Sequence, residues 1–205
     1  MPGTGLATVT YSFAGNKDGQ TPAAGLIRVG DSLYGTTAGG GASGRGTVFA
    51  INLATGVERV VHAFAGSDGA QPLSALTYVG GRLYGTTFGG GAAGSGTVFS
   101  IDPASGTETV LHSFSGKDGA NPLAALVELQ GQLYGSTKGG GAGGFGTLFR
   151  IDSETGNLKT VHDFSGGSDG ANPAAPLINA GGILFGSTTR GGSSSDGGTV
   201  FKFQP

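Results

Sequence analysis

Residues 96–114 read GTVFSIDPASGTETVLHSF, and the opening motif of this stretch recurs along the whole chain of 205 residues. GTVF or GTLF begins at Gly46, Gly96, Gly146 and Gly198, which are steps of 50, 50 and 52 residues. An aromatic residue between leucine and glycine keeps the same spacing, at Tyr34, Tyr84, Tyr134 and Phe185. Self-similarity at a fixed period marks a repeat architecture, so the chain consists of four units of about fifty residues.

Each unit is predicted to contain four short β-strands, because no window has the i, i+3, i+4, i+7 apolar spacing of a helix. In the second unit the expected strands are residues 75–79, 82–87, 97–101 and 107–114. Gly80 and Gly81 favour a tight hairpin, since both central residues of such a turn need positive φ. The connections 89–96 and 115–124 are longer. Because antiparallel strands alternate in direction, the long connections are expected on one face, where binding groups are commonly carried.

Four strands in about fifty residues is the pattern of a propeller blade. We therefore predict an all-β fold, namely a four-bladed β-propeller with four antiparallel strands per blade. Residues 6–13 align with a fourth strand such as 57–64, whereas 199–203 aligns with a third strand. The ring is predicted to close by pairing 6–13 with 199–203, which removes an open sheet edge. A larger ring made by two chains is the alternative blade count.

Length and composition favour a single domain outside the cytoplasm. One domain is expected over residues 1–205, with repeats at about 14–64, 65–114, 115–164, and 165–205 plus 6–13. The first residues, MPGTGLATVT, lack a basic segment followed by an apolar one, and no stretch approaches the roughly 20 apolar residues of a membrane span. We therefore expect no membrane insertion. A weakly charged surface rich in Gly, Ser, Thr and Ala favours an extracellular or cell-surface location, with any signal peptide removed.

Composition also excludes several classes of function. Only 12% of the residues are charged and the net charge is −2, so the chain has no basic cluster to contact a phosphate backbone, and nucleic acid is not an expected partner. Cysteine is absent, which excludes disulfides and thiol catalysis. Glycine takes 45 positions without a three-residue period, which indicates turns and not a collagen-like helix.

The succession GTVF, LHxF, DGxxP and LYGTT followed by a glycine run resembles the bacterial tandem repeat known as the Gloeo-Verruco, or choice-of-anchor, repeat. The resemblance spans essentially the whole chain. It implies a secreted or surface-displayed repeat protein that is often anchored by additional segments. More loosely, the turns at Thr55 and Thr155 resemble those of quinoprotein propeller blades. The tryptophan that those blades carry on the outer strand is absent here, and no cofactor is expected.

Two sets of polar residues repeat with the units. Asp-Gly pairs place carboxylates on the long-loop side at Asp18, Asp68, Asp118 and Asp169. Such carboxylates can ring a cation, but the stronger interpretation is that they bond their own backbone in turns between blades. Histidines align at His62, His112 and His162, with Tyr11 at the fourth place. Equivalent outer-strand positions diverge from the axis, so we expect half-buried packing residues with locally satisfied ring nitrogens, and neither a metal site nor a catalytic set.

A third set of residues breaks the repeat within the long loops. Phe88 aligns with Lys138, Arg190 falls close by, and Arg45 aligns with Phe145. These five residues, together with the four aspartates, are the candidate ligand-binding residues. Aromatic stacking and fork-like donors suit a sugar ring or a protein surface. Neutral drift in exposed loops is the alternative explanation.

Three functions remain open from the sequence. The first is a non-catalytic extracellular module that binds a glycan or a protein, or that serves as a scaffold. The second is a carbohydrate-active enzyme such as a lyase or a glycosidase, which needs a carboxylate or a basic residue converging on the channel mouth. The third is self-assembly, because a nearly symmetric and weakly charged disc can form homo-oligomers by stacking its faces.

Overall fold

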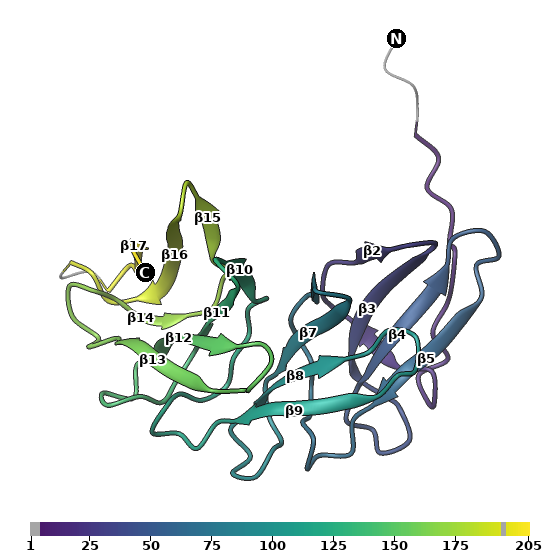
Figure 1. Ribbon diagram of the computed structural model, residues 1–205, viewed down its shortest axis with the longest axis horizontal. Helices are drawn as coiled ribbons and strands as arrows, with labels where there is room; N and C mark the ends of the chain where they lie inside the picture. The colour runs from purple at the N-terminus through teal and green to yellow at the C-terminus, as the bar shows by residue number, and fades with distance from the viewer. Residues whose placement is uncertain (1–4, 194–195) are drawn as a thin grey trace.

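The computed structural model describes residues 5–193 and 196–205, and within those ranges it contains β-strands and no helix (Figure 1). Residues 1–4 and 194–195, which the sequence assigns to the single domain 1–205, lie outside the described residues. In the described part of the chain, no helix is long and apolar enough to cross a membrane. The predicted all-β class is therefore confirmed.

The strands form four antiparallel sheets, one for each repeat unit. The first sheet contains β1 (Gln20–Pro22), β2 (Ile27–Val29), β3 (Ser32–Gly39), β4 (Thr47–Asn52) and β5 (Glu58–Ala63). The second contains β6 (Thr77–Val79), β7 (Arg82–Thr87), β8 (Thr97–Ile101) and β9 (Glu108–Ser113). The third contains β10 (Val127–Leu129), β11 (Gln132–Thr137), β12 (Thr147–Asp152) and β13 (Leu158–Asp163). The last contains β14 (Ala171–Pro173), β15 (Ile178–Ala180), β16 (Ile183–Arg190) and β17 (Thr199–Phe203).

The second sheet shows how closely the strands follow the sequence pattern. Its order is β6-β7-β8-β9, so each strand pairs with the next one along the chain. All five residues of β8 are buried, because β7 and β9 flank this strand and neighbouring sheets cover its two faces. A register shift between Val98 and Phe99 bends the strand where it pairs with β9, and the first and third sheets repeat this shift.

The hydrophobic core lies between successive sheets and is built around one repeated contact. Phe64, directly after β5, packs edge to face on Phe99 of β8, with ring centroids 5.1 Å apart. The same contact joins Phe114 to Phe149 at 5.3 Å and Phe164 to Phe201 at 5.2 Å. The glycine after each aromatic residue of the LYG motif makes room for this ring. A Cβ on Gly85 would lie 2.5 Å from Cζ of Phe99.

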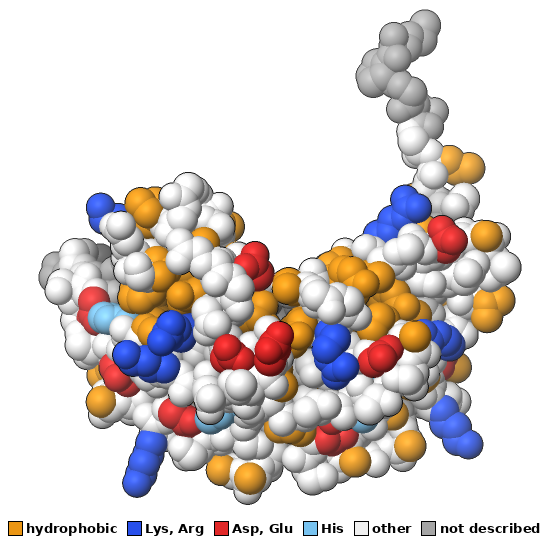
Figure 2. Space-filling view, viewed as in Figure 1, with side chains coloured by type: hydrophobic (Ala, Val, Ile, Leu, Met, Phe, Trp, Pro, Cys, Tyr) orange, Lys and Arg blue, Asp and Glu red, His pale blue; other side chains and the backbone are white. Residues whose placement is uncertain are grey.

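The predicted closure of a four-bladed ring is not formed in this structure. The four sheets lie in an open arc, with the first and the last at its two ends (Figure 1). Residues 5–13 form no strand, and among the described strands only β16 pairs with β17. Three successive steps of the phenylalanine packing, which join the four sheets, carry them through only part of a circle, so residues 6–13 and β17 stay apart. Figure 2 shows the concave opening between the two ends, with hydrophobic side chains on its walls.

Candidate functional site

The long-loop face is made by two kinds of connection that touch within each unit. One joins the second strand of a unit to the third, as between β7 and β8, and the other leads from one sheet to the next, as between β5 and β6. The amide of Gly91 in the first kind donates to the carbonyl oxygen of Gly66 in the second over 2.8 Å. Gly141 donates to Gly116 in the same way over 2.9 Å. The loops therefore form one surface of hydrogen-bonded backbone.

The glycine runs after the second strand allow this close approach of backbone. Gly90 has φ 75, and a Cβ there would lie 2.5 Å from the carbonyl oxygen of Gly66. The runs therefore serve the close packing of backbone on backbone. They offer no helix N-terminus for an anion, because no helix occurs in the described residues.

The four aspartates of the Asp-Gly pairs hold the turns between sheets. Asp68 accepts the backbone amide of Ala65 at 2.8 Å, and its other carboxylate oxygen lies 2.9 Å from Nε2 of His62. Asp118 repeats both contacts with Ser115 and His112. In the first unit the hydroxyl of Tyr11 takes the place of the histidine and donates to Asp18 over 2.9 Å. The local hydrogen bond predicted for these ring nitrogens is confirmed.

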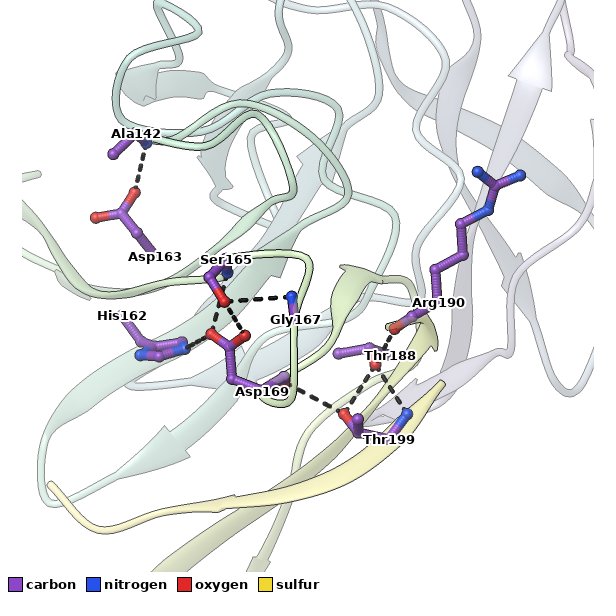
Figure 3. A network of polar contacts seen from close by, with 9 residues as sticks. All are labelled: Ala142, His162, Asp163, Ser165, Gly167, Asp169, Thr188, Arg190 and Thr199. Atoms are coloured by element: carbon purple, nitrogen blue, oxygen red, sulfur yellow. Dashed lines mark hydrogen bonds and ion pairs between the residues drawn. The ribbon is translucent and has the colours of Figure 1, made fainter. Parts of the chain in front are cut away.

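Figure 3 shows this network in the last unit. Asp169 accepts hydrogen bonds from the amide and the hydroxyl of Ser165, and it contacts Nε2 of His162 at 3.1 Å. The carbonyl oxygen of Asp169 accepts from the hydroxyl of Thr199 at 3.3 Å, which ties the turn to β17. The side chain of Arg190 extends away from these groups and is exposed. The Asp169 carboxylate therefore holds the connection between the third and the fourth sheet.

The hydrogen bonds of these turns also shift the pKa values of Asp118 and Tyr11. Burial pulls the pKa of Asp118 upward, but hydrogen bonds from Ser115 and His112 outweigh it and leave the pKa below its ordinary value. The hydrogen bond to Asp18 is the largest cause that raises the pKa of Tyr11 to about 12. Asp118 thus remains charged, and the Tyr11 phenol remains protonated, around neutral pH.

One cluster of titratable groups lies between the first two sheets. His62, Asp68 and Glu108 each place one nitrogen or oxygen atom within 4.8 Å of the others. Burial, and next the charge of Asp68, raise the pKa of Glu108 to about 7, and its Oε1 atom is buried without a hydrogen-bond partner. The three ligand types suit a divalent cation, and the same groups can instead hold a proton on Glu108. The third unit has Leu158 at the position of Glu108.

Sequence reasoning missed this cluster because its members belong to different units. His62 and Asp68 were recognised as repeated positions, but Glu108 enters from the neighbouring sheet. The signal lay in the alignment of Glu58 with Glu108 against Leu158, since two acidic residues occupy a strand position that is apolar elsewhere.

The variable candidate residues stand on a backbone that is continuous across the sheets. The amide of Gln71 donates to the carbonyl of Arg45 at 2.8 Å, and its own carbonyl accepts from the amide of Phe88 at 3.0 Å. Asn121 continues the chain, because its side-chain amide donates to the carbonyl of Phe88 at 2.9 Å and its carbonyl accepts from the amide of Lys138 at 3.2 Å. Gln71 and Asn121 both have a left-handed backbone conformation, with φ 56, which allows them to form these bridges.

The same pattern joins the third and fourth units. The side-chain amide of Asn172 donates to the carbonyl of Lys138 at 2.8 Å, and its backbone amide donates to the carbonyl of Phe145 at 2.7 Å. Four of the five variable residues are therefore linked in one row through their backbones. Arg190 is the last residue of β16, and its backbone carbonyl accepts from the hydroxyl of Thr188 at 2.9 Å.

The side chains of the variable residues are displayed separately along this row. Arg45, Lys138 and Arg190 are exposed, the ring of Phe145 is 41% exposed, and Phe88 is half-buried. The Phe145 ring lies over Gly166, where a Cβ would come within 2.8 Å of it. Within the described residues, no hydrogen bond, ion pair or ring contact joins these five side chains to one another. The structure thus places them on one face without gathering them into a pocket.

These features define a class of protein: a tandem-repeat protein with an all-β, propeller-like arrangement of sheets and a shared face of long loops. The chain belongs to the Gloeobacter/Verrucomicrobia repeat family, whose model matches residues 1–142 and again residues 121–205. The family resemblance of the sequence motifs is thereby confirmed. A search of curated proteins gave no match.

Solved structures support the fold. A europium-containing methanol dehydrogenase superposes with a TM-score of 0.64 at 15% identity, covering 97% of this chain and 42% of that one. The extracellular domain of a one-component system from B. thetaiotaomicron gives 0.61 at 14% identity, over 90% of this chain and 21% of that one. TolB from Acinetobacter baumannii gives 0.54 at 17% identity, over 85% and 41%. This chain thus spans less than half the length of these propeller-like structures, and the likeness concerns the fold alone.

Proposed function

We propose that this chain is a non-catalytic, extracellular binding module built from propeller blades, and that its long-loop face binds an acidic glycan. One observation carries the proposal. The residues that differ between units are displayed on a loop backbone that recurs in the first three units and is bridged by hydrogen bonds from Gln71, Asn121 and Asn172. A constant frame with varied, exposed side chains is the usual design of a binding surface.

The chemistry of the variable residues points to the class of ligand. Arg45, Lys138 and Arg190 place three cations on this face of a chain whose net charge is −2. Guanidinium groups pair well with carboxylates and sulfates, and the exposed ring of Phe145 offers an apolar surface for the face of a sugar. An extended row of separate side chains suits a polymer better than a small molecule. An acidic polysaccharide meets each of these requirements.

The extracellular location is part of the proposal. One solved structure with a similar fold is the extracellular domain of a bacterial one-component system, and the weakly charged composition agrees with such a location. A glycan-binding role outside the cell is consistent with both observations.

The repeats supply variants that test the site without disturbing the scaffold. Phe145→Ser and Arg45→Ser install the residue that the second unit carries as Ser95, whereas Lys138→Ala and Phe88→Ala install the residue that the first unit carries as Ala38. Each change therefore places a side chain that this loop already accommodates. Binding should be measured on an array of acidic and neutral glycans and then quantified by calorimetry.

We expect binding of acidic polysaccharides that weakens at least tenfold in the Phe145→Ser, Lys138→Ala double variant and weakens with added salt. The matched control is Tyr78→Asn, which removes an exposed aromatic residue from β6 and installs the residue of the fourth unit, Asn179. Affinity should not change in this control. The proposal is wrong if no glycan binds, or if the double variant binds as well as the original chain.

A further inference from the structure

The outer edge of the last sheet is bare where the other sheets are covered. In the first three sheets β5, β9 and β13 lie outside the third strand, and they leave Val48 and Val98 at 0% exposure and Leu148 at 3%. Val200 occupies the same position in β17 and is 83% exposed. Within the described residues, β17 has no strand on its outer side. A groove along this edge is lined by apolar side chains, including Leu148, Phe164, Phe201 and Phe203.

Residues 6–13 have the character of the strand that this edge lacks. Their sequence, LATVTYSF, matches TETVLHSF at 107–114. In the structure this run is largely bare, with Val9 exposed to 82%. Apolar residues that alternate along an extended run and face solvent are typical of a β-strand that lacks its partner strand.

Contacts with the first sheet confirm that the run already sits as a fourth strand would. Phe13 packs edge to face on Phe49 with ring centroids 4.9 Å apart, as Phe64 packs on Phe99. The Tyr11 hydroxyl binds Asp18 as the histidines bind their aspartates. The carbonyl oxygen of Thr10 lies 3.5 Å from where a Cβ on Gly56 would stand, as that of Val61 lies beside Gly106. The run therefore has the neighbours of an outer strand on one side and none on the side where a third strand belongs.

The unpaired edge of β17 and the unpaired residues 6–13 lie at opposite ends of the arc (Figure 1). Along the inside of the arc, β2 contacts β6, β6 contacts β10, and β10 contacts β15. The last sheet lacks an outer strand, and residues 6–13 lack a third strand to pair with. The curvature of the arc keeps these two segments apart within one chain. A second copy presents both missing halves in the required order.

We propose that two copies of this chain form a single ring of eight sheets, in which residues 6–13 of each copy pair with β17 of the other. The assembly has two identical junctions related by a two-fold axis and leaves no open sheet edge. Eight sheets is within the range found for propellers. The inference is independent of the proposed glycan binding.

The repeat fixes the expected register of the junction. Val98 pairs with His112 and Phe99 pairs with Val110 in the complete second sheet. By alignment, Val200 faces Tyr11 of the second copy and Phe201 faces its Val9. Val200 and Val9 are then removed from solvent together, which supplies the apolar surface that drives the association.

Engineered cysteines test this register directly, because the chain has no cysteine of its own. We would prepare Tyr11→Cys and Val200→Cys as two separate single variants, mix them, and oxidise the mixture with oxidised glutathione, which accepts the two electrons and two protons of the thiol pair. Both variants alter side chains at the bare ends, so the fold should survive, and circular dichroism checks this. The readout is gel mobility without reductant.

The mixture should give a covalent dimer that holds one cysteine of each kind, and the double variant Tyr11→Cys, Val200→Cys should give a doubly linked dimer. A mixture of Tyr78→Cys with Val200→Cys is the matched control, since Tyr78 is exposed on β6 of the second sheet, away from both ends of the arc, and it should remain uncrosslinked. An internal bond in the double variant would mean that one chain closes on itself and would overturn the proposal. No crosslink, or a ladder of longer polymers, would overturn it as well.

Light scattering of the original chain provides a second measurement that needs no variant. The expected mass is twice the 19.9 kDa of one chain, and it should fall toward one chain in Val200→Lys, which places a charge in the junction. Tyr78→Lys adds the same charge on the second sheet and should leave the dimer intact. A monomer at all concentrations, or a dimer unaffected by Val200→Lys, contradicts the proposal.

Discussion

Phe13 packs edge to face on Phe49 with the same geometry that Phe64 adopts on Phe99, at centroid distances of 4.9 and 5.1 Å. The first contact is made by a run that forms no strand, and the second by a residue that directly follows a complete outer strand. The phenylalanine contact is therefore the joint from one unit to the next, and it persists where the rest of the sheet is missing.

The joint predicts a difference between two phenylalanine substitutions. Phe114 is fully buried against Phe149, so Phe114→Ala should lower the free energy of unfolding by ~3 to 5 kcal/mol. Phe13→Ala should lower it by roughly half of that or less, because Phe13 is only half-buried. Urea unfolding followed by circular dichroism checks both values. Equal losses would mean that the first joint is packed as tightly as the internal ones.

Much of the fold could be predicted because the unit is repeated four times. The strands expected at 82–87 and 97–101 are the strands observed, since hairpin glycines and alternating apolar residues fix them locally. Ring closure could not be predicted in this way. It depends on the angle added at each joint, which arises from side-chain packing between sheets and leaves no trace in the spacing of motifs.

A second pair of substitutions tests the role of the loop glycines. Gly90→Ala forces a positive φ on alanine and places its Cβ 2.5 Å from the Gly66 carbonyl oxygen, so the loss of stability should be about 2 to 4 kcal/mol. Gly89→Ala is the control one residue earlier, where the nearest atom would be 3.8 Å away and the φ is ordinary. It should change stability by less than about 0.5 kcal/mol. Thermal unfolding of the two variants side by side gives the comparison.

The histidine to aspartate contacts predict that tyrosine can replace histidine. His112→Tyr should remain nearly as stable as the original chain, because Tyr11 already binds Asp18 through its hydroxyl at the equivalent place. His112→Ala removes a hydrogen bond to a charged group and should destabilise the fold by ~1.5 kcal/mol. If alanine is tolerated as well as tyrosine, the contact with Asp118 contributes nothing to the turn.

Glu108 predicts a pH dependence of stability. Its pKa is raised to about 7 in the folded protein from 4.5, so the folded state binds the proton more tightly than the unfolded state. The unfolding free energy should therefore fall as the pH rises from about 4.5 to about 7. With this half-exposed residue screened by solvent, the fall should be ~1 kcal/mol. Unfolding curves at several pH values measure it.

Glu108→Leu is the matched variant, because the third unit carries Leu158 at this position. It should be more stable than the original chain at pH 8 and should lose part of the slope between pH 4.5 and 7. Burial, and next the charge of Asp18, also raise the pKa of Glu58, which accounts for the part that remains. An unchanged slope in Glu108→Leu would contradict the assignment.

The candidate site could be predicted in part from the sequence. The variable residues were found because four aligned copies make any departure visible, as when Phe145 stands where Ser95 stands in the second unit. The backbone bridges through Asn121 and Asn172 could not be found, because their left-handed φ and their reach to the next sheet depend on how the units pack. The sequence likewise gave no sign that the Phe145 ring lies over Gly166.

An NMR titration of the labelled chain with an acidic polysaccharide locates the surface that we propose as the binding site, namely the long-loop face. We expect the amide shifts to change at Phe88, Asn121, Lys138 and Phe145 while Tyr78 and the hairpin at Gly80 stay constant. Changes centred on the hairpin side, or spread evenly over the chain, would mean that the long-loop face is not the binding surface.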